Sequence, residues 1–166
     1  MFRLLGIAIG FLITYPAQAV VEVGERVPNL CYVDVNEYPI CLDHIRDSVR
    51  VLIYSTGWCP GCKEEMRELV PLVNEFKGKP VQFISLSAQG ESSGSLPDTD
   101  FLKRWKSNYQ IPFVVAGAPR DAGKNFFTPP NRIPNVVIID KSGVVTAKEV
   151  GMSAHEIVSK VRTLLK

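Results

Sequence analysis

The chain has 166 residues, and its 19 lysines and arginines against 17 aspartates and glutamates give a formal charge of +2. This near-neutral balance gives no electrostatic argument for nucleic-acid binding, and the length suits one ordinary domain with its own core. The 4 cysteines are an even number, which fits an oxidising compartment.

The N-terminus is typical of a signal peptide. A short positive start, Met1–Arg3, precedes an apolar stretch, Leu4–Ile13, that is too short to span a bilayer comfortably, and Ala17–Ala19 offers small residues for cleavage. We expect residues 1–19 to be removed after Ala19, leaving residues 20–166 as an exported domain, in the bacterial periplasm. The loss of one charge, that of Arg3, lowers the formal charge from +2 to +1. An uncleaved anchor is the alternative, and no later segment is long and apolar enough to be a transmembrane helix.

The rest of the chain alternates strand and helix patterns. Strand, helix and strand at the observed spacing predict a parallel pair with a right-handed crossover, and Pro71 should kink the helix that contains it. The predicted elements are a hairpin (30–35 and 40–42), a strand (51–55), a helix (60–77), a strand (81–86), a loop (88–97), a helix from 98 or 99, a strand (113–115), a stretch with Pro and Gly (116–132), a hairpin (135–140 and 144–150) and a helix opened by a capping box at 153–156.

The segment Trp58–Cys62, with the sequence WCPGC, lies where an apolar strand gives way to a helix. Cys59 then sits at the positive end of the helix, where unpaired N–H groups favour its thiolate, and Cys62 one turn later can resolve a mixed disulfide. A structural pair or half of a metal site is the alternative. A structural zinc site needs four ligands, no second closely spaced cysteine pair exists, and His44 and His155 are far apart in sequence. We therefore expect a redox dithiol and no metal.

Three passages resemble the exported TlpA/ResA branch of the thioredoxin-like proteins, over roughly residues 24–166. They are the opening Gly24–Leu30, the cysteine segment Trp58–Cys62 with Glu65, and the proline loop and hairpin Arg132–Gly143. The resemblance implies an α/β fold in which helices flank a central mixed sheet, with an added N-terminal β-hairpin and a central insertion.

The resemblance also implies roles near the cysteines. Pro134 would form a cis peptide bond beside the disulfide, and Ile133 would offer its backbone to the extended chain of a partner. Trp58, Pro60 and Gly61 would belong to the same substrate-binding surface. An ordinary trans proline at a strand start is the alternative for Pro134.

Thioredoxins proper carry a buried aspartate six residues before the first cysteine, where this chain has Ile53. In the ResA-like branch a glutamate after the next strand supplies a carboxylate, and Glu91 matches that position. It would accept the proton of Cys62 and oppose thiolate formation at Cys59. The alternative is a solvated loop glutamate.

Cys31 and Cys41 flank the first hairpin, where facing cysteines can form a structural disulfide in an oxidising compartment. Two independent buried thiols, or a second redox couple, are the alternatives.

Together these features predict an exported thiol–disulfide oxidoreductase with no cofactor beyond its own Cys59–Cys62 disulfide. The resemblance implies reduction of protein disulfides, including those of apocytochrome c, with electrons from a membrane dithiol donor. Cys-Pro-Gly-Cys also occurs in oxidising relatives, so a disulfide oxidase or isomerase is the first alternative. A copper- or zinc-binding chaperone is the second. The sequence does not indicate the oligomeric state.

Overall fold

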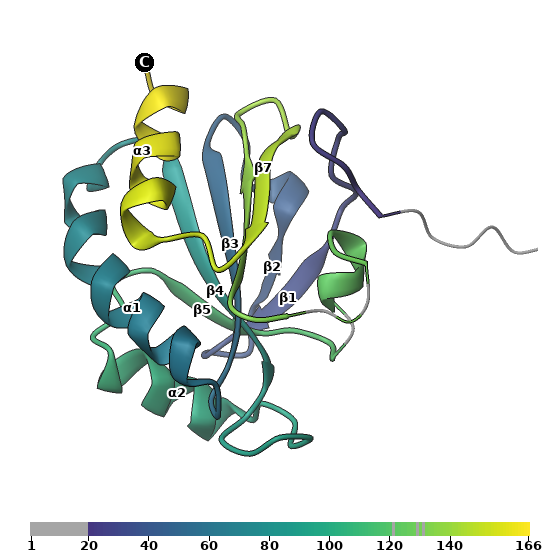
Figure 1. The fold of residues 1–166 in the computed structure, drawn as a ribbon, viewed down its shortest axis with the longest axis vertical. Coiled ribbons are helices and arrows are strands. Elements are labelled where there is room, and N and C mark those ends of the chain that lie inside the picture. The colour runs from purple at the N-terminus through teal and green to yellow at the C-terminus, as the bar shows by residue number, and fades with distance from the viewer. Residues whose placement is uncertain (1–19, 121, 129, 131) are drawn as a thin grey trace, which may run out of the picture.

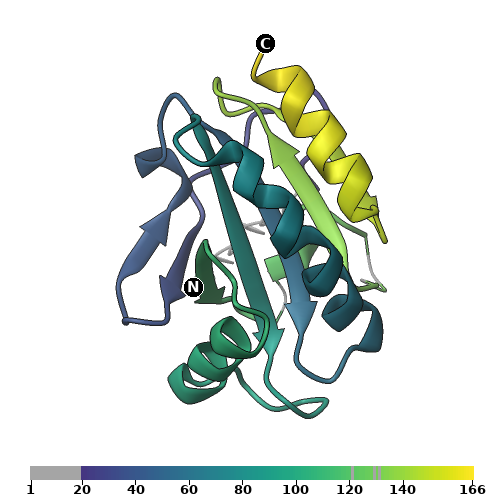
Figure 2. The same ribbon diagram turned by 90° about the vertical axis from the view of Figure 1, so that its left-hand side faces the viewer.

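The computed structural model describes residues 20–120, 122–128, 130 and 132–166. The predicted signal peptide and its cleavage site lie outside these residues. A 7-stranded mixed sheet, in the order β2-β1-β5-β4-β3-β6-β7, is flanked by helices (Figures 1 and 2). The predicted α/β fold is confirmed. Its elements are β1 (Cys31–Asp34), β2 (Pro39–Cys41), η1 (Leu42–His44), β3 (Val49–Thr56), α1 (Pro60–Leu72), η2 (Val73–Phe76), β4 (Val81–Gln89), α2 (Thr99–Asn108), β5 (Val114–Gly117), η3 (Ala122–Asn125), β6 (Asn135–Ile139), β7 (Val145–Val150) and α3 (Ala154–Leu164).

The centre of the sheet is buried on both faces. β3 runs parallel to β4 and antiparallel to β6. Alternate β3 side chains enter two separate cores, with Val51 and Ile53 on one face and Leu52 and Tyr54 on the other. A strand covered on both sides needs a continuous apolar run, and this requirement explains the sequence VLIY.

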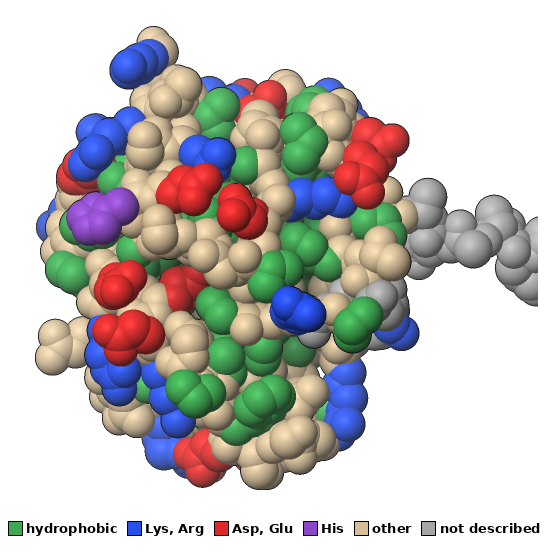
Figure 3. All heavy atoms as spheres, viewed as in Figure 1, with side chains coloured by type: hydrophobic (Ala, Val, Ile, Leu, Met, Phe, Trp, Pro, Cys, Tyr) green, Lys and Arg blue, Asp and Glu red, His purple; other side chains and the backbone are tan. Residues whose placement is uncertain are grey.

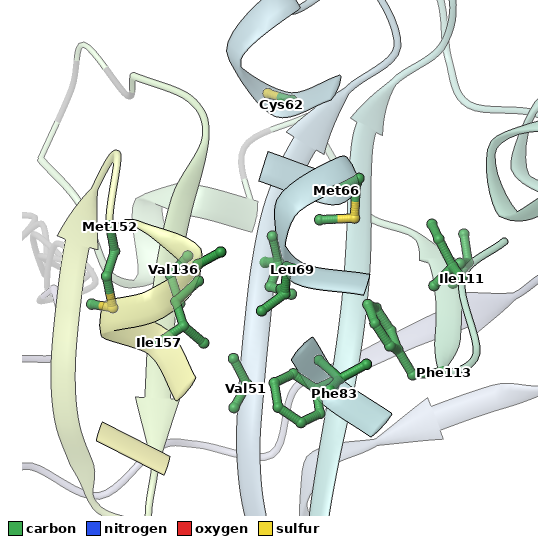
Figure 4. Packing of buried hydrophobic residues seen from close by; sticks show 14 of the residues in the cluster. Val51, Cys62, Met66, Leu69, Phe83, Ile111, Phe113, Val136, Met152 and Ile157 are labelled. Carbon is green, nitrogen blue, oxygen red and sulfur yellow. The ribbon is translucent and has the colours of Figure 1, made fainter. Parts of the chain in front are cut away.

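One core lies between the sheet and the three helices. Met66 and Leu69 of α1 and Ile157 of α3 are fully buried there (Figure 4), and α1 and α3 lie side by side on that face (Figures 1 and 2). The opposite core lies under the N-terminal segment, the hairpin and η3, and includes Phe126. This packing fixes α1 relative to the carboxyl end of β3, where the cysteine segment begins.

The helix and the strand that follow the cysteine segment differ in length from the prediction. The helix expected over 60–77 ends at Leu72 and continues as the 3₁₀ helix η2. Pro71 lacks the N–H that would donate to the residue four positions earlier, so the last turn tightens. β4 reaches Gln89 instead of ending at residue 86, and a register shift between Ser55 and Thr56 accommodates the added length.

The N-terminal hairpin extends one edge of the sheet. Cys31 and Cys41 are directly opposite each other in its register, with Cα atoms 4.0 Å apart, and form a disulfide. β1 also pairs with β5 through Val33 and Gly117, so the disulfide fastens the outermost strand to the rest of the sheet. A structural role for this disulfide remains a prediction.

We expect the Cys31→Ser/Cys41→Ser variant to lose about 2–3 kcal/mol of unfolding free energy, because the bridge closes a loop across a sequence separation of 10. Urea denaturation of the oxidised proteins measures this loss. The variant should keep the reactivity of Cys59, and peptide mapping of the wild type should recover the 31–41 linkage. Unchanged stability together with free thiols at both positions would contradict a structural role.

Candidate active site

The cysteine segment follows a close crossing of two loops after β3. The Gly57 N–H donates to the Gly90 carbonyl at 3.0 Å. A Cβ on Gly57 would lie 2.6 Å from that carbonyl oxygen and 2.5 Å from the Phe101 ring. Only glycine fits this position, and it brings the loop after β4 alongside the start of α1.

Cys59 is the N-cap residue of α1. It has extended backbone angles, and its sulfur accepts a hydrogen bond from the Cys62 N–H at 3.1 Å. Pro60 occupies the first helical position, where its missing N–H leaves no donor unsatisfied. The Cys62 N–H, a free donor at the start of the helix, therefore points towards this sulfur. That this placement favours the Cys59 thiolate remains a prediction.

Cys59 and Cys62 are joined by a disulfide, with Cα atoms 5.3 Å apart. Cys59 is 5 % exposed and Cys62 is fully buried. An incoming thiolate or disulfide therefore reaches Cys59 first, and Cys62 remains in the core as the resolving thiol.

The proline loop lies directly beside the disulfide. The Ile133–Pro134 peptide bond is cis, as expected from the resemblance. The Ile133 carbonyl oxygen is 3.9 Å from Cys59 Sγ, and a Cβ on Gly61 would touch the Pro134 ring at 3.4 Å. The structure thus brings together four residues that were selected from sequence, namely Cys59, Gly61, Ile133 and Pro134. The binding of a partner chain by Ile133 remains a prediction.

Trp58 is held at the surface by a side chain that sequence reasoning did not select. The indole N–H donates to Gln89 Oε1 at 3.0 Å, and the same oxygen accepts from the Gly94 N–H at 2.7 Å. The register shift that pairs Thr56 with Gln89 leaves Ala88 as the extra residue of a β-bulge. Gln89, which follows the bulge, thus links the loop over 90–97 to Trp58, whose side chain is 40 % exposed.

Glu65 lies one helical turn after Cys62 and is 6 % exposed. Both of its carboxylate oxygens are buried with no hydrogen-bond partner among the described residues. Burial, with a smaller contribution from Glu68, raises its pKa from 4.5 to about 8. A carboxyl that changes protonation near neutral pH, on the same helix face as the resolving thiol, is placed to exchange a proton with that thiol.

The other two positions discussed from sequence are also located. Ile53 is fully buried in the core that holds both cysteines, so the strand offers no carboxylate there. Glu91 is 68 % exposed and forms an ion pair with Arg104 at 3.0 Å. Glu91 shares a surface hollow with Gly57 and Lys63, and its proposed effect on the cysteines remains a prediction.

The burial of Glu65 could have been inferred from spacing. Cys62, Glu65, Met66 and Leu69 follow the i, i+3, i+4, i+7 pattern of one helix face, and all four are buried. The sequence contained no comparable signal for Gln89, because a bulge leaves no periodic trace.

Within the described residues, no group of three or more His, Cys, Asp or Glu side chains could hold a metal ion. In the same residues, no helix is long and apolar enough to cross a membrane.

Residues 23–148 match the profile of the AhpC/TSA family. The chain belongs to that family. Among curated relatives, it is 26% identical over 138 residues to the thiol–disulfide oxidoreductase ResA of Bacillus anthracis, covering 81% of this chain and 73% of the relative.

Solved structures share its fold. A putative protein disulfide isomerase from Bacteroides thetaiotaomicron superposes with a TM-score of 0.75 at 16% identity, covering 88% of this chain and 91% of that one. A thiol:disulfide interchange protein from Chlorobium tepidum TLS gives 0.72 at 19% identity, covering 89% and 100%. The prediction of a thioredoxin-like oxidoreductase is confirmed.

After reduction, a limiting amount of iodoacetamide near neutral pH should label Cys59 before Cys62. Cys59 is the more accessible thiol, and its sulfur faces the helix N-terminus. Peptide mapping by mass spectrometry identifies the labelled residue. A Cys59→Ser variant should lose the fast labelling phase, whereas preferential labelling of Cys62 in the wild type would reverse the two roles.

Glu65 should make stability depend on pH. Its pKa rises from 4.5 unfolded to about 8 folded, so its contribution is complete below pH 4.5 and is lost as pH rises through 8. Relative to Glu65→Gln, the oxidised wild type should lose on the order of 3 kcal/mol of unfolding free energy between pH 4.5 and 7.

Urea denaturation at a series of pH values measures this difference. Glu64→Gln is the matched control, because Glu64 is adjacent but 60 % exposed and ion-paired with Arg67. Parallel stability curves for wild type and Glu65→Gln would show that Glu65 does not titrate in this range.

Proposed function

We propose that this protein is an exported thiol–disulfide oxidoreductase that reduces disulfides in partner proteins. The observation that carries the proposal is the position of Cys59. Its sulfur caps α1, is disulfide-bonded to Cys62 and lies 3.9 Å from the Ile133 carbonyl of the proline loop. This arrangement places three groups together: Cys59 as the nucleophile, Cys62 as the resolving thiol, and the Ile133 backbone, which could pair with the extended chain of a partner protein.

In the reductive reaction the Cys59 thiolate attacks one sulfur of a partner disulfide. A mixed disulfide forms, the partner's S–S bond breaks, and its other sulfur leaves as a thiolate that takes up a proton. Cys62 then loses its proton and attacks Cys59 Sγ, which releases the second partner thiol. Two electrons pass from the dithiol to the partner, and the Cys59–Cys62 disulfide remains.

Glu65 is the proposed acceptor of the Cys62 proton. Cys62 is fully buried and so has no direct access to solvent bases. A glutamate with a pKa of about 8 is close in proton affinity to a thiol, so proton transfer between them is nearly balanced. Glu91, exposed and paired with Arg104, would act only through its charge.

The surface around Cys59 suits a protein partner. Trp58 and Val150 are 40% and 41% exposed, and Val150 pairs with Asn135 directly after the cis proline. Apolar side chains gather in the lower central part of the face in Figure 3, and charged groups lie around them. An apolar surface of this kind favours contact with an unfolded or extended chain.

Export and substrate are part of the proposal. Support for export comes from the signal-like N-terminus and from two disulfides, which persist in oxidising compartments. In that setting a membrane dithiol donor would return the pair to the reduced state. The similarity to ResA supports apocytochrome c haem-binding cysteines as one substrate class. An oxidase would use the same geometry with the opposite electron flow, and an isomerase would use it with no net electron transfer.

The reduction potential decides the direction. A reductant should lie nearer to about −270 mV than to about −120 mV, the values of a reducing and a strongly oxidising relative. Equilibration of the Cys31→Ser/Cys41→Ser variant with dithiothreitol and glutathione buffers isolates the Cys59–Cys62 couple. A value near the oxidising limit would reject the reductase and favour the oxidase alternative.

A further inference from the structure

A second polar site lies at the opposite end of β3 from the cysteines. It is a hollow of about 360 Å³ beside the turn that joins β6 to β7. Arg50, near the start of β3, is six residues before Thr56 at its end, and this separation corresponds to about 20 Å along the strand. The hollow is lined by Arg26, Val27, Pro28, Leu42, Asp43, Ile45, Arg46, Asp47, Arg50, Lys141, Ser142 and Gly143.

Two guanidinium groups converge on Gly143. A Cβ at this glycine would lie 3.0 Å from Arg26 Nη1 and 3.8 Å from Arg50 Nη2, so the position stays open only because it has no side chain. Its φ of +90° also favours glycine. The chain therefore brings two like charges together from the N-terminal segment and from a central strand.

Both arginines are bound to main-chain oxygens. Arg26 donates to the Ser142 carbonyl, and Arg50 donates to those of Leu42 at 3.0 Å and Asp140 at 2.9 Å. The Asp140 carboxylate accepts from Val144 N–H and Ser142 O–H. Among the described residues, no carboxylate lies within 4.0 Å of either guanidinium to form an ion pair.

The burial of Arg50 makes this arrangement unfavourable without a counter-ion. Arg50 is 6 % exposed, and its Nε is buried without a partner among the described atoms. Burial lowers its pKa; of the nearby charges, Asp140 raises it and Arg26 lowers it. An anion in the hollow would offset both the desolvation and the repulsion.

We propose that this hollow binds a phosphate group. Arg26, Arg46, Arg50 and Lys141 place four cations on its wall, and Asp43 and Asp47 are the two acidic residues there. The cations come from four separate segments, so they approach from different sides. A tetrahedral phosphate offers acceptor oxygens in several directions, whereas a carboxylate offers two in one plane.

The phosphate has two possible sources with the same chemistry, the free ion and the headgroup of an anionic lipid. Calorimetric titration with inorganic phosphate, at constant ionic strength set with chloride, tests the first source. Sedimentation with phosphatidylcholine vesicles, with and without phosphatidylglycerol, tests the second. Both use the oxidised full-length protein.

Arg26→Gln and Arg46→Gln are the test variants, because both side chains are exposed and their loss should not prevent folding. Each should weaken binding about tenfold through the loss of a charged hydrogen bond. Lys103→Gln removes the same charge from α2, outside the hollow, and should bind as the wild type does. All three should keep the alkylation rate of Cys59, so this result is separate from the redox proposal.

Binding of inorganic phosphate that both arginine variants lose and Lys103→Gln keeps would assign the free ion. The same pattern only with phosphatidylglycerol vesicles would assign the lipid headgroup. The proposal is overturned if neither probe binds the wild type, if the arginine variants bind normally, or if Lys103→Gln loses binding equally.

Discussion

The hydrogen bond from the Cys62 amide to the Cys59 sulfur, at 3.1 Å, is the contact on which the redox site depends. It exists only if α1 begins at Pro60, immediately after β3. Gly57 permits the crossing with the next loop, Pro60 starts the helix, and the core beneath Met66 and Leu69 holds the helix axis. Packing against the sheet thus fixes α1 so that the unpaired Cys62 N–H points at the Cys59 sulfur.

The same burial that protects Cys62 creates the need for an internal proton acceptor. A thiolate in an apolar core is costly, and Ile53 supplies no charge or hydrogen bond from the strand. In the proposed reaction Glu65 takes the place of the missing strand carboxylate, since it is buried on the same helix face as Cys62, one turn later. Its own burial brings its pKa into the range of a thiol.

Much of the fold could be predicted because its central strands are covered on both faces. Continuous apolar runs mark β3 and β6. A capping box followed by apolar residues on one helix face marks α3, and Ser153 accepts from the Glu156 N–H as the capping box predicts. The cysteine pair at a helix start likewise follows from local sequence. Gln89 could not be found in this way, since an inserted residue in β4 alters which face a side chain occupies without altering composition. The start of β3 at Val49 was also missed, because the charged Arg50 interrupts the apolar pattern and the strand was predicted to begin at residue 51.

Arg50 and Glu65 show how this sheet accommodates ionisable groups. Both side chains are buried, and burial disfavours the charged form of each. Arg50 keeps its charge because two backbone carbonyls accept from its guanidinium, that of Leu42 in η1 and that of Asp140 in the β6–β7 turn. Glu65 has no such acceptors or donors and therefore becomes neutral more easily. The two sides of β3 thus differ. Its amino end holds the charge of Arg50, which the proposed anion would complement, whereas α1, beyond its carboxyl end, holds a carboxyl whose pKa is raised to about 8.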